Sequence, residues 1–402
     1  ENVGSQLHPF ERGREAKGVD RRFGGGDFSD TMIGFVSSGQ FGVGRGARPG
    51  TPAGPRRAVV VASASQMRVL VIGGTRFSGL YLTKELADAG HEVVLFNRGN
   101  KKIGDKSLMV PGESESAFEE RNKNTSVIVG DRTNEDDMVS KLKGEEFDAI
   151  YDNNGRELTD SKPLIDLFKG RVKHYVYMSS AGVYLKSDIM PHIEGDATDP
   201  KSRHKGKLHT EDYLKEQDVP YTSIRPTYIY GALNYNPLEE WFFERIAAGR
   251  PVPVPGSGLN LTGLGHVKDL ARAMASVLGN DKAIQQIYNI QDNKAITFDG
   301  IVRECAKAAG KDPESVEIVH YSPKDFDFGK KKAFPMRPQH FFTSPFKALT
   351  DLDWTIEYDT QSGLRDSFEN DFSIKQSEGK LKNDFSTDDM VIEKMAPNLL
   401  KV

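Results

Sequence analysis

The feature that most constrains the fold of this chain is a short apolar run that leads directly into a glycine-rich turn. Residues 67–72 read Met-Arg-Val-Leu-Val-Ile, the nearly continuous apolar pattern of a strand buried on both faces of a sheet. Residues 73–79 read Gly-Gly-Thr-Arg-Phe-Ser-Gly, and the amphipathic segment that follows predicts a helix over residues 77–89, ended by Gly90. Residues 92–97 are again apolar. Strand, tight turn, helix and strand in this order predict a βαβ unit.

The alternation of strands and helices continues along the chain. Further strands are predicted at residues 126–129, 147–151, 174–178 and 221–224, helices at residues 134–142 and 208–217, and a long polar insertion at residues 99–124. This pattern predicts an α/β fold, with a Rossmann-like, doubly wound parallel sheet. We assign residues 67–225 to this nucleotide-binding core.

The composition of the sequence changes after residue 225, where prolines become frequent. Four prolines, at positions 237, 251, 253 and 255, punctuate the next stretch, so residues 226–350 are predicted to form a smaller C-terminal α/β lobe, with some return of the chain to the core sheet. Residues 351–402 are a C-terminal segment. Its part from residue 372 has a weak hydrophobic pattern and is predicted to be a partly ordered tail.

The first 66 residues differ from the rest and show no apolar periodicity. They hold nine Lys and Arg and six acids, the last of which is Asp30. Residues 32–64 are free of acids and rich in small residues, a composition typical of an organelle transit peptide. Residues 1–66 are therefore predicted to be a disordered leader with a transit peptide, and Met32, the first Met, to be the true start. The alternative is an extension that stays on the mature protein.

Composition excludes several classes of protein. The chain has 402 residues, with 54 Lys and Arg against 58 Asp and Glu, so a uniformly basic coat for nucleic acid is excluded and any such partner must bind a local patch. No apolar run approaches the roughly 20 residues that a transmembrane helix needs, so no membrane span is predicted. Cys305 is the single cysteine, which excludes an internal disulfide framework and a thiolate metal cluster.

The glycine turn resembles that of the extended short-chain dehydrogenase/reductase superfamily. Gly73 and Gly79 match the outer glycines of its motif, whereas Arg76 stands where the middle glycine is expected. The resemblance implies an NADP site, intact or vestigial, because Arg98 follows the second strand where a basic residue accepts the 2′-phosphate. The cofactor-binding residues that the resemblance implies are Gly73, Gly74, Arg76, Gly79, Arg98, Asp131 and Ser179. The later landmarks of the superfamily extend the resemblance over residues 67–310.

The reductive chemistry of that superfamily requires a Tyr four residues before a Lys, because the Lys lowers the pKa of the phenol. The best candidate for the Lys is Lys207, and the residue four positions earlier is Arg203. Arg cannot exchange a proton at physiological pH. Reductase activity is therefore predicted to be lost while the fold is kept.

A basic segment replaces the missing Tyr. Residues 201–209 read Lys-Ser-Arg-His-Lys-Gly-Lys-Leu-His and are predicted to lie at the carboxyl edge of the sheet, where ligands bind in this fold. A local positive patch on an acidic chain indicates a polyanion; a solvated basic loop is the alternative. A second patch, Lys330, Lys331 and Lys332, lies near Phe326, Phe328 and Phe334, which would stack on unpaired bases or else turn into the core.

These features together resemble the chloroplast stem-loop binding proteins, and most of all their b type. The resemblance rests on the leader, the Gly-Gly-Thr-Arg-Phe turn, the missing Tyr and the Lys-Ser-Arg-His-Lys run, and it covers nearly all of residues 67–395. It implies a protein of the chloroplast stroma that binds and cleaves stem-loop RNA and acts in transcript and ribosomal RNA metabolism. It further implies association with plastid ribosomal particles and plastid RNA polymerase, and assembly into homo-oligomers and into hetero-oligomers with the a type.

The hypothesis for the site follows from residue chemistry. Cleavage of RNA requires a base, an acid and positive charge on the phosphate. The catalytic candidates are His204, His209 and Lys207, and the RNA-binding candidates are Lys201, Arg203, His204, Lys205, Lys207, Lys330, Lys331 and Lys332. No cofactor is expected for RNA binding, no metal-ligand cluster stands out, and Mg²⁺ is a candidate only for cleavage. Two rival functions stay open: an NADP-dependent reductase or epimerase on a sugar nucleotide, and a non-catalytic scaffold that senses a nucleotide.

Overall fold

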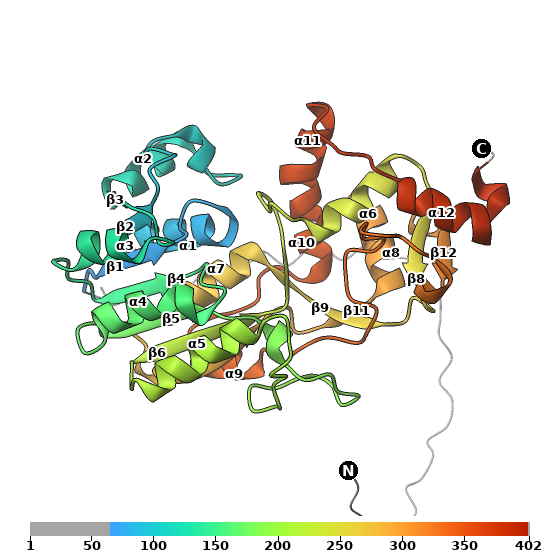
Figure 1. The fold of residues 1–402 in the computed structure, drawn as a ribbon. Coiled ribbons are helices and arrows are strands. Elements are labelled where there is room, and N and C mark those ends of the chain that lie inside the picture. Colours follow the sequence, from blue (N-terminus) through green and yellow to red (C-terminus); the bar gives the residue numbers. More distant parts are fainter. Residues whose placement is uncertain (1–64, 401–402) are drawn as a thin grey trace, which may run out of the picture. The chain divides into compact units, whose positions relative to one another are not determined.

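A computed structural model describes residues 65–400, so the predictions for the leader lie outside the described residues. Its main sheet has seven parallel strands in the order β10-β6-β5-β4-β1-β2-β3 (Figure 1). The strands are β1 Arg68–Ile72, β2 Glu92–Asn97, β3 Thr125–Val129, β4 Ala149–Asp152, β5 His174–Met178, β6 Tyr221–Pro226 and β10 Gln286–Ile290. The predicted Rossmann-like α/β fold is confirmed.

The sheet is buried on both faces because its strands are apolar on both. Along β1, Val69 and Val71 pack into one hydrophobic cluster, while Leu70 and Ile72 pack into another on the opposite face. Helices α1 and α7 lie together on the first face, and α3, α4 and α5 cover the second (Figure 1). Two more helices pack here, α2 against α1 and β3, and α9 against β10. The bounds of the seven are α1 Phe77–Asp88, α2 Glu115–Lys123, α3 Glu135–Leu142, α4 Leu158–Phe168, α5 Lys205–Glu216, α7 Val267–Ser276 and α9 Phe346–Asp351.

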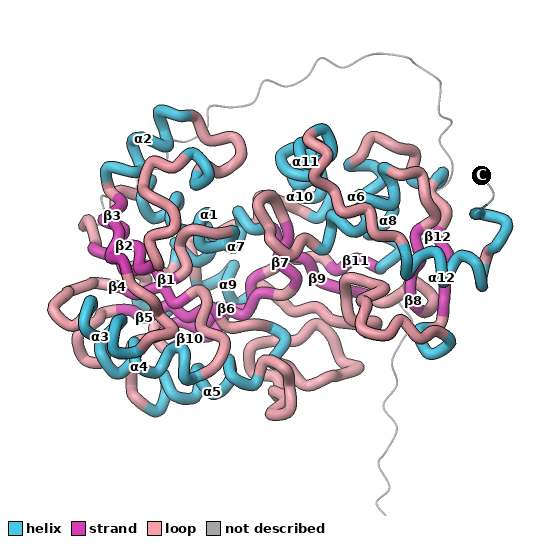
Figure 2. Tube along the Cα trace, turned by 45° about the horizontal axis from the view of Figure 1, so that its top comes forward, coloured by secondary structure: helices cyan, strands magenta, loops and turns pink. Residues whose placement is uncertain are grey.

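The smaller lobe has its own strands and core. Figure 2 shows its two small sheets beyond the main one, with the orders β11-β9-β7 and β12-β8. Its strands are β7 Tyr228–Tyr230, β8 Val252–Pro255, β9 Leu261–His266, β11 Ala295–Thr297 and β12 Ile318–Tyr321. Its helices are α6 Leu238–Ala247, α8 Phe298–Ala308, α10 Thr360–Ser367, a π-helical turn Phe368–Phe372, α11 Ser373–Ser377 and α12 Ser386–Met395. Short 3₁₀ turns lie at Lys106–Leu108, Ala181–Val183, Asp281–Ala283, Pro313–Ser315, Pro323–Asp325 and Pro397–Leu400.

Two predictions need correction, and one helix was not predicted. The predicted helix over residues 208–217 begins at Lys205, so half of the basic segment is helical and not a loop. Helix α4 is not predicted by the sequence pattern, because Pro163 lies inside it. The expected weak ordering of residues 372–402 is not what the structure shows up to residue 400, since α12 packs on the smaller lobe and buries Val391 and Ile392.

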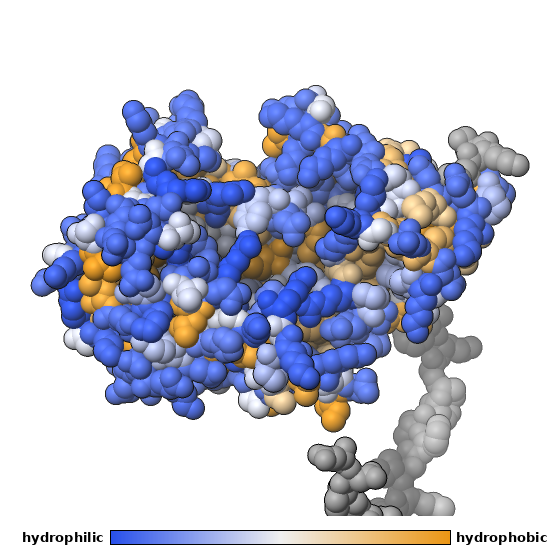
Figure 3. Space-filling model, in the orientation of Figure 1, coloured by the Kyte–Doolittle hydropathy of each residue, from blue (hydrophilic) through white to orange (hydrophobic). Residues whose placement is uncertain are grey.

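Strand order sets the place of the functional site. The strand order reverses between β1 and β4: β2 and β3 extend the sheet on one side of β1, and β4, β5 and β6 extend it on the other. In such folds ligands bind outside the carboxyl ends of the strands at this switch point. Ile72, which precedes the glycine turn, lies directly opposite Asp152 of β4. Figure 3 shows the surface hollowed between the main sheet and the smaller lobe, with hydrophilic side chains around the hollow and hydrophobic ones deeper inside.

Candidate functional site

The glycine turn requires glycine at its two outer positions. Gly73 has a φ of +81°, a conformation that side chains other than glycine rarely adopt. A Cβ at Gly79 would lie 2.0 Å from the carbonyl oxygen of Gly73. These two glycines therefore let α1 begin directly against the end of β1, so the N-terminus of the helix lies where a pyrophosphate binds in this fold.

Arg76 occupies the middle position of the motif and is exposed. It is the residue before α1, and its guanidinium carbon lies 4.6 Å from the centre of the Tyr235 ring. The side chain is therefore directed at an aromatic ring of the smaller lobe, across the mouth of the turn.

Polar atoms without partners surround the carboxyl ends of the neighbouring strands. Within the described residues, the side chains of Asn97, Asn153 and Ser179 each bury a nitrogen or oxygen that makes no hydrogen bond to protein. They follow or end β2, β4 and β5. Buried polar groups are normally paired, so this edge has the donors and acceptors that a dinucleotide would satisfy.

Arg98 and Asp131 are brought together at the same edge. Arg98 is exposed, and hydrogen bonds from Thr133, with the nearby charge of Arg98, lower the pKa of Asp131. All seven residues predicted for a cofactor thus lie at the carboxyl edge of β1, β2, β3 or β5, or in the turn after β1. The residues present fit a dinucleotide, with Arg76 as the exception.

Lys207 points inward from the first turn of α5. Its ammonium donates to the carbonyl oxygens of Gly155, at 2.6 Å, and Met178, and lies over the ring of Tyr177. Burial lowers the pKa of Lys207 to about 8, although Asp152 nearby opposes the shift. Lys207 therefore contributes positive charge to the floor of the site and does not reach outward as a surface contact.

The position of the missing Tyr is filled by an exposed Arg. Arg203 Nε donates to His204 Nε2 at 3.0 Å, and the ring of His204 lies against Gly182 in the turn after β5. Burial lowers the pKa of His204 to about 4, and the charges of Arg203 and Arg337 add to this effect. The imidazole is therefore neutral near pH 7.

His209 is not part of this arrangement. It is exposed, and it lies two residues beyond Lys207 on α5, which places the two side chains on opposite sides of the helix. The structure thus brings His204 and Lys207 to the site and leaves His209 outside it.

Lys332, the last residue of the second basic patch, lies close enough to Arg203 of the first patch for their charges to interact. Desolvation lowers the pKa of Lys332 and that of Arg337, and for both the positive charge of Arg203 lowers it further. Lys330 is exposed, and Lys331 donates to Ser386 and faces Asp384 at 3.5 Å. Arg203, Lys332 and Arg337 therefore form one cluster of like charges, named the cation cluster below.

The aromatic residues near this patch are turned inward. Phe334 is buried in the core of the smaller lobe, and Phe326 and Phe328 stack on each other and pack on Tyr321. Of the two interpretations offered for them, the structure supports packing in the core.

Asp152 is committed to a buried network. Arg132 pairs with it at 2.6 Å, and Ser161 and Tyr175 donate to it at 2.6 and 3.1 Å. Burial alone would raise the pKa of Asp152, but the guanidinium and the hydrogen bonds outweigh burial and lower it. Among the described residues, no group of three His, Cys, Asp or Glu side chains is placed to hold a metal ion. In residues 65–400 no helix is long and apolar enough to cross a membrane.

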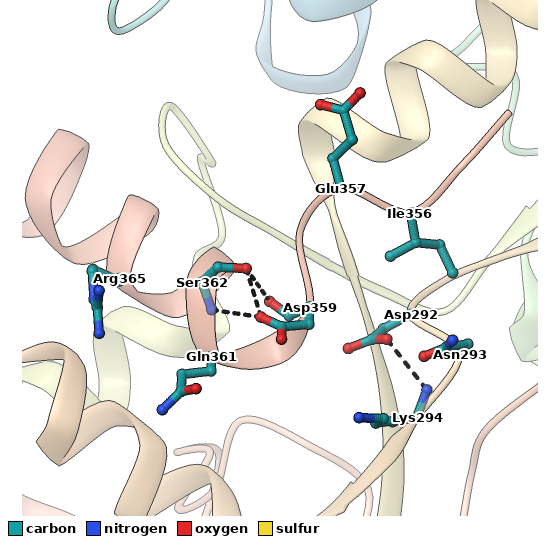
Figure 4. Close-up of a pocket in the computed structure, with 9 residues that line it drawn as sticks. All are labelled: Asp292, Asn293, Lys294, Ile356, Glu357, Asp359, Gln361, Ser362 and Arg365. Atoms are coloured by element: carbon teal, nitrogen blue, oxygen red, sulfur yellow. Dashed lines mark hydrogen bonds between the residues drawn. The ribbon is translucent and has the colours of Figure 1, made fainter. Parts of the chain in front are cut away.

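A polar pocket of about 420 Å³ lies beyond the end of β10. Two of its carboxylates are used within the fold. Asp292 accepts from the backbone and hydroxyl of Thr360. Asp359 accepts from the backbone and hydroxyl of Ser362 at the start of α10 (Figure 4). These carboxylates hold the N-terminus of α10 in place. None of the residues that line the pocket has a buried polar side-chain atom without a hydrogen-bond partner, so nothing here indicates a ligand.

Sequence reasoning missed three parts of the site: Arg337, Tyr235 and the Arg132–Asp152 pair. Arg337 and Tyr235 stand alone in irregular segments and carry no local signal. Asp152 ends β4 and Arg132 lies just after β3, so their shared place at the carboxyl edge of the sheet is the only signal in the sequence that could link them.

Comparison with known proteins places the chain in a family of nucleotide-binding proteins, in agreement with the fold and the glycine turn. The model of the NAD dependent epimerase/dehydratase family matches residues 69–290. The chain is 52% identical over 340 residues to the chloroplast stem-loop binding protein of 41 kDa b of Arabidopsis thaliana, covering 85% of this chain and 88% of that protein. The chain therefore belongs to the NAD dependent epimerase/dehydratase family and, within it, to the chloroplast stem-loop binding proteins, as the sequence motifs predict.

Solved structures support the fold. The UDP-glucose 4-epimerase of Thermotoga maritima has a TM-score of 0.61 at 19% identity and covers 77% of this chain and 100% of its own. The dTDP-glucose 4,6-dehydratase of Bacillus anthracis, in complex with NAD, has a TM-score of 0.61 at 19% identity and covers 77% and 98%. At these identities the likeness extends to the fold alone.

Proposed function

We propose that this chain binds stem-loop RNA in the chloroplast, through the cation cluster at the mouth of the former reductase site. The observation that carries the proposal is the gathering of Arg203, Lys332 and Arg337 from two distant parts of the sequence. Within the described residues none of the three is in an ion pair with a carboxylate, and no Asp or Glu side chain shifts the pKa of Lys332 or Arg337. Like charges held together without a counter-charge are stabilised by an anion, and phosphate is the anion that RNA offers.

The exposed lysines around the cluster extend the same surface. Lys201, Lys205 and Lys330 are exposed and would add contacts to the phosphate backbone. Contacts of this kind recognise the shape and backbone of RNA and not a linear sequence. The Arabidopsis relative is named for stem-loop binding and as chloroplastic, which supports the partner and the compartment.

We further propose endoribonuclease activity carried by His204 and Lys207, with Arg203 on the scissile phosphate. The imidazole of His204 is neutral, and its Nε2 would accept a proton once the Arg203 guanidinium that donates to it turns to the scissile phosphate. The ammonium of Lys207, whose pKa burial lowers to about 8, would donate a proton from the floor of the site. Mg²⁺ stays a candidate for cleavage only. His209 lies outside this arrangement, so it provides a matched control.

The resemblance to the b type extends the proposal to the stroma and to transcript and ribosomal RNA metabolism. The partners proposed with it are plastid ribosomal particles, plastid RNA polymerase, further copies of this chain and the a-type relative.

A second function is favoured by the unpaired atoms of Asn97, Asn153 and Ser179 beside the glycine turn: retention of a nicotinamide dinucleotide, NADP by the presence of Arg98. When bound, the nicotinamide would supply hydride transfer. The chain holds Lys207 for that chemistry and has Arg203 in place of the Tyr, so we propose nucleotide sensing over turnover as a reductase or epimerase.

The test uses the full chain and a labelled stem-loop RNA, with binding followed against salt concentration. The variant Arg203→Ala/Lys332→Ala/Arg337→Ala is expected to bind at least about tenfold more weakly and to lose about two to three units of the salt slope. The control replaces Lys143, Lys169 and Lys173, which are exposed at the amino edge of the sheet, and should behave as wild type. Equal loss in both variants, or none in either, would show that the cation cluster is not the RNA site.

Cleavage is followed in the same samples with and without EDTA. His204→Ala should slow cleavage by at least about a hundredfold, the usual contribution of a general base, and His209→Ala should leave it unchanged. Cleavage that depends on His209 and not on His204 would contradict the assignment. Binding of NADPH to wild type, without its oxidation in the presence of UDP-glucose, would support the sensing function.

A further inference from the structure

Tyr235 is an exposed aromatic ring held beside the glycine turn. Its side chain is 63% exposed, and it lies on the loop between β7 and α6. Its ring contacts two residues of the glycine turn after β1, Arg76 and Phe77. The Arg76 guanidinium lies 4.6 Å from the ring centre, and the Phe77 ring meets it edge-on at 6.2 Å. The phenol ring and the guanidinium thus form one exposed pair at the entrance to the site.

The backbone on both sides of this pair is held in an unfavourable conformation. Phe77 has a φ of +41° and Leu233 a φ of +67°, values that residues other than glycine rarely adopt. The loop that carries Tyr235 is fixed by Asn234, which donates to the Ile229 carbonyl at 3.2 Å and accepts from the backbone of Asn236 at 2.9 Å. Such conformations cost free energy and persist only where the surrounding structure holds them, and they cluster at functional sites. Two of them in contacting segments therefore point to a function for this pair.

The pair also has unused binding capacity. Among residues 65–400, Arg76 takes part in no ion pair and makes no side-chain hydrogen bond to protein, so its donors are available to a phosphate. A tyrosine ring that is mostly exposed offers a surface for stacking a base, and arginine beside it adds a cation–π contribution.

We infer that Arg76 and Tyr235 bind one unpaired nucleotide of RNA, with its base stacked on Tyr235 and its phosphate on Arg76. The inference rests on the proposed RNA-binding function and adds selection: the cation cluster binds the backbone of any RNA, and the pair recognises the unpaired loop. A base inside a duplex is stacked between its neighbours and is not available to a protein side chain, whereas a loop base is, so this site separates a stem-loop from the interior of a duplex.

The test compares the full chain on a stem-loop and on a blunt duplex with the same stem. Tyr235→Leu should weaken stem-loop binding by about tenfold or more and leave duplex binding unchanged, whereas Tyr235→Phe should retain wild-type selectivity. Arg76→Ala should lose the selectivity and about one unit of the salt slope for the stem-loop. The control is Phe346→Ala, because Phe346 is 73% exposed on α9 and should have no effect.

A spectroscopic measurement separates stacking from an indirect effect on folding. With 2-aminopurine in the loop of the RNA, wild type and Tyr235→Phe should quench its fluorescence, and Tyr235→Leu should not. Absence of quenching by wild type, or equal quenching by Tyr235→Leu, overturns the inference.

The two proposals fail separately. If the triple variant of the cation cluster loses binding and Tyr235→Leu keeps the stem-loop preference, the inference is wrong and the proposed function stands. If the triple variant binds as wild type does, the proposed function is wrong. If Tyr235→Leu keeps the RNA preference and binds NADP more tightly than wild type, the pair covers the glycine turn against a dinucleotide, and the inference is wrong.

Discussion

The ammonium of Lys207 donates a hydrogen bond of 2.6 Å to the carbonyl oxygen of Gly155. This bond ties the first turn of α5 to the loop after β4, across the carboxyl edge of the sheet. A residue expected to hold RNA phosphates is thus part of the internal support of the site. Neighbouring Lys205 is exposed on the same helix, so the two lysines allow support and RNA binding to be separated.

Lys207→Met is expected to lower the free energy of unfolding by about 1–3 kcal/mol, because the buried carbonyl groups of Gly155 and Met178 each lose a charged donor, and Gly155 keeps only the Tyr177 hydroxyl. Lys205→Met should change it by less than about 0.5 kcal/mol. Urea denaturation measures both. The salt slope of RNA binding should show the opposite order, with Lys205→Met reducing it and Lys207→Met leaving it unchanged. A stable Lys207→Met that has lost the slope would contradict the inward role.

Asp152→Ala should destabilise the protein by about 3–5 kcal/mol, because it leaves the Arg132 guanidinium buried without its counter-charge. The comparison is Asp166→Ala, which breaks an exposed pair with Lys162 and should cost no more than about 1 kcal/mol. Both values come from urea denaturation. Adding Arg132→Met to Asp152→Ala should restore part of the loss; if the double variant is less stable than the single one, the guanidinium is supported by other groups.

The core of the fold could be predicted because its signals are local. The strand at 92–97 and the strand at 174–178 have the predicted bounds, and Gly90, with its φ of +86°, ends α1 as expected. Helix α5 begins three residues earlier than predicted, because Gly206 hides its first turn in the sequence. That glycine is required by a distant contact: a Cβ there would lie 2.5 Å from the backbone carbonyl oxygen of Arg156.

The site could be predicted only in part, since its main features join distant segments. The basic run near residue 203 is visible in the sequence, but its meeting with Lys332 and Arg337 depends on how the smaller lobe folds back. The direction of each side chain is also a property of the fold. Lys207 and His209 differ by two positions on one helix, and only one of them faces the site.

Asp388→Ala tests whether the C-terminal helix belongs to the folded core. Asp388 is fully buried and pairs with buried Arg245, which donates to it at 3.1 Å and lies 3.9 Å from the Trp241 ring. The change should cost about 3–5 kcal/mol in urea denaturation. Asp389→Ala, next to it, removes a partly exposed partner of Arg250 and should cost no more than about 1 kcal/mol. Equal, small losses would show that α12 does not contribute to the stability of the core.

Glu239 is expected to make the free energy of unfolding fall as the pH rises from about 4.5 to about 7. The side chain is buried and accepts from the Gly231 backbone at 2.8 Å and from the Ser367 hydroxyl at 2.7 Å. Burial raises the pKa of Glu239 to about 7, and nearby Asp371 adds to the shift.

Between about pH 4.5 and about pH 7 the folded chain therefore keeps a proton that the unfolded chain releases, so the free energy of unfolding decreases over this window and levels off above it. Glu239→Gln stays neutral and keeps an acceptor for both donors. It should match wild type near the lower limit of the window and be more stable by about 1–3 kcal/mol near pH 8. Urea denaturation of both proteins across this range measures the difference. A difference that does not change with pH would show that Glu239 is ionised in the folded protein throughout the window.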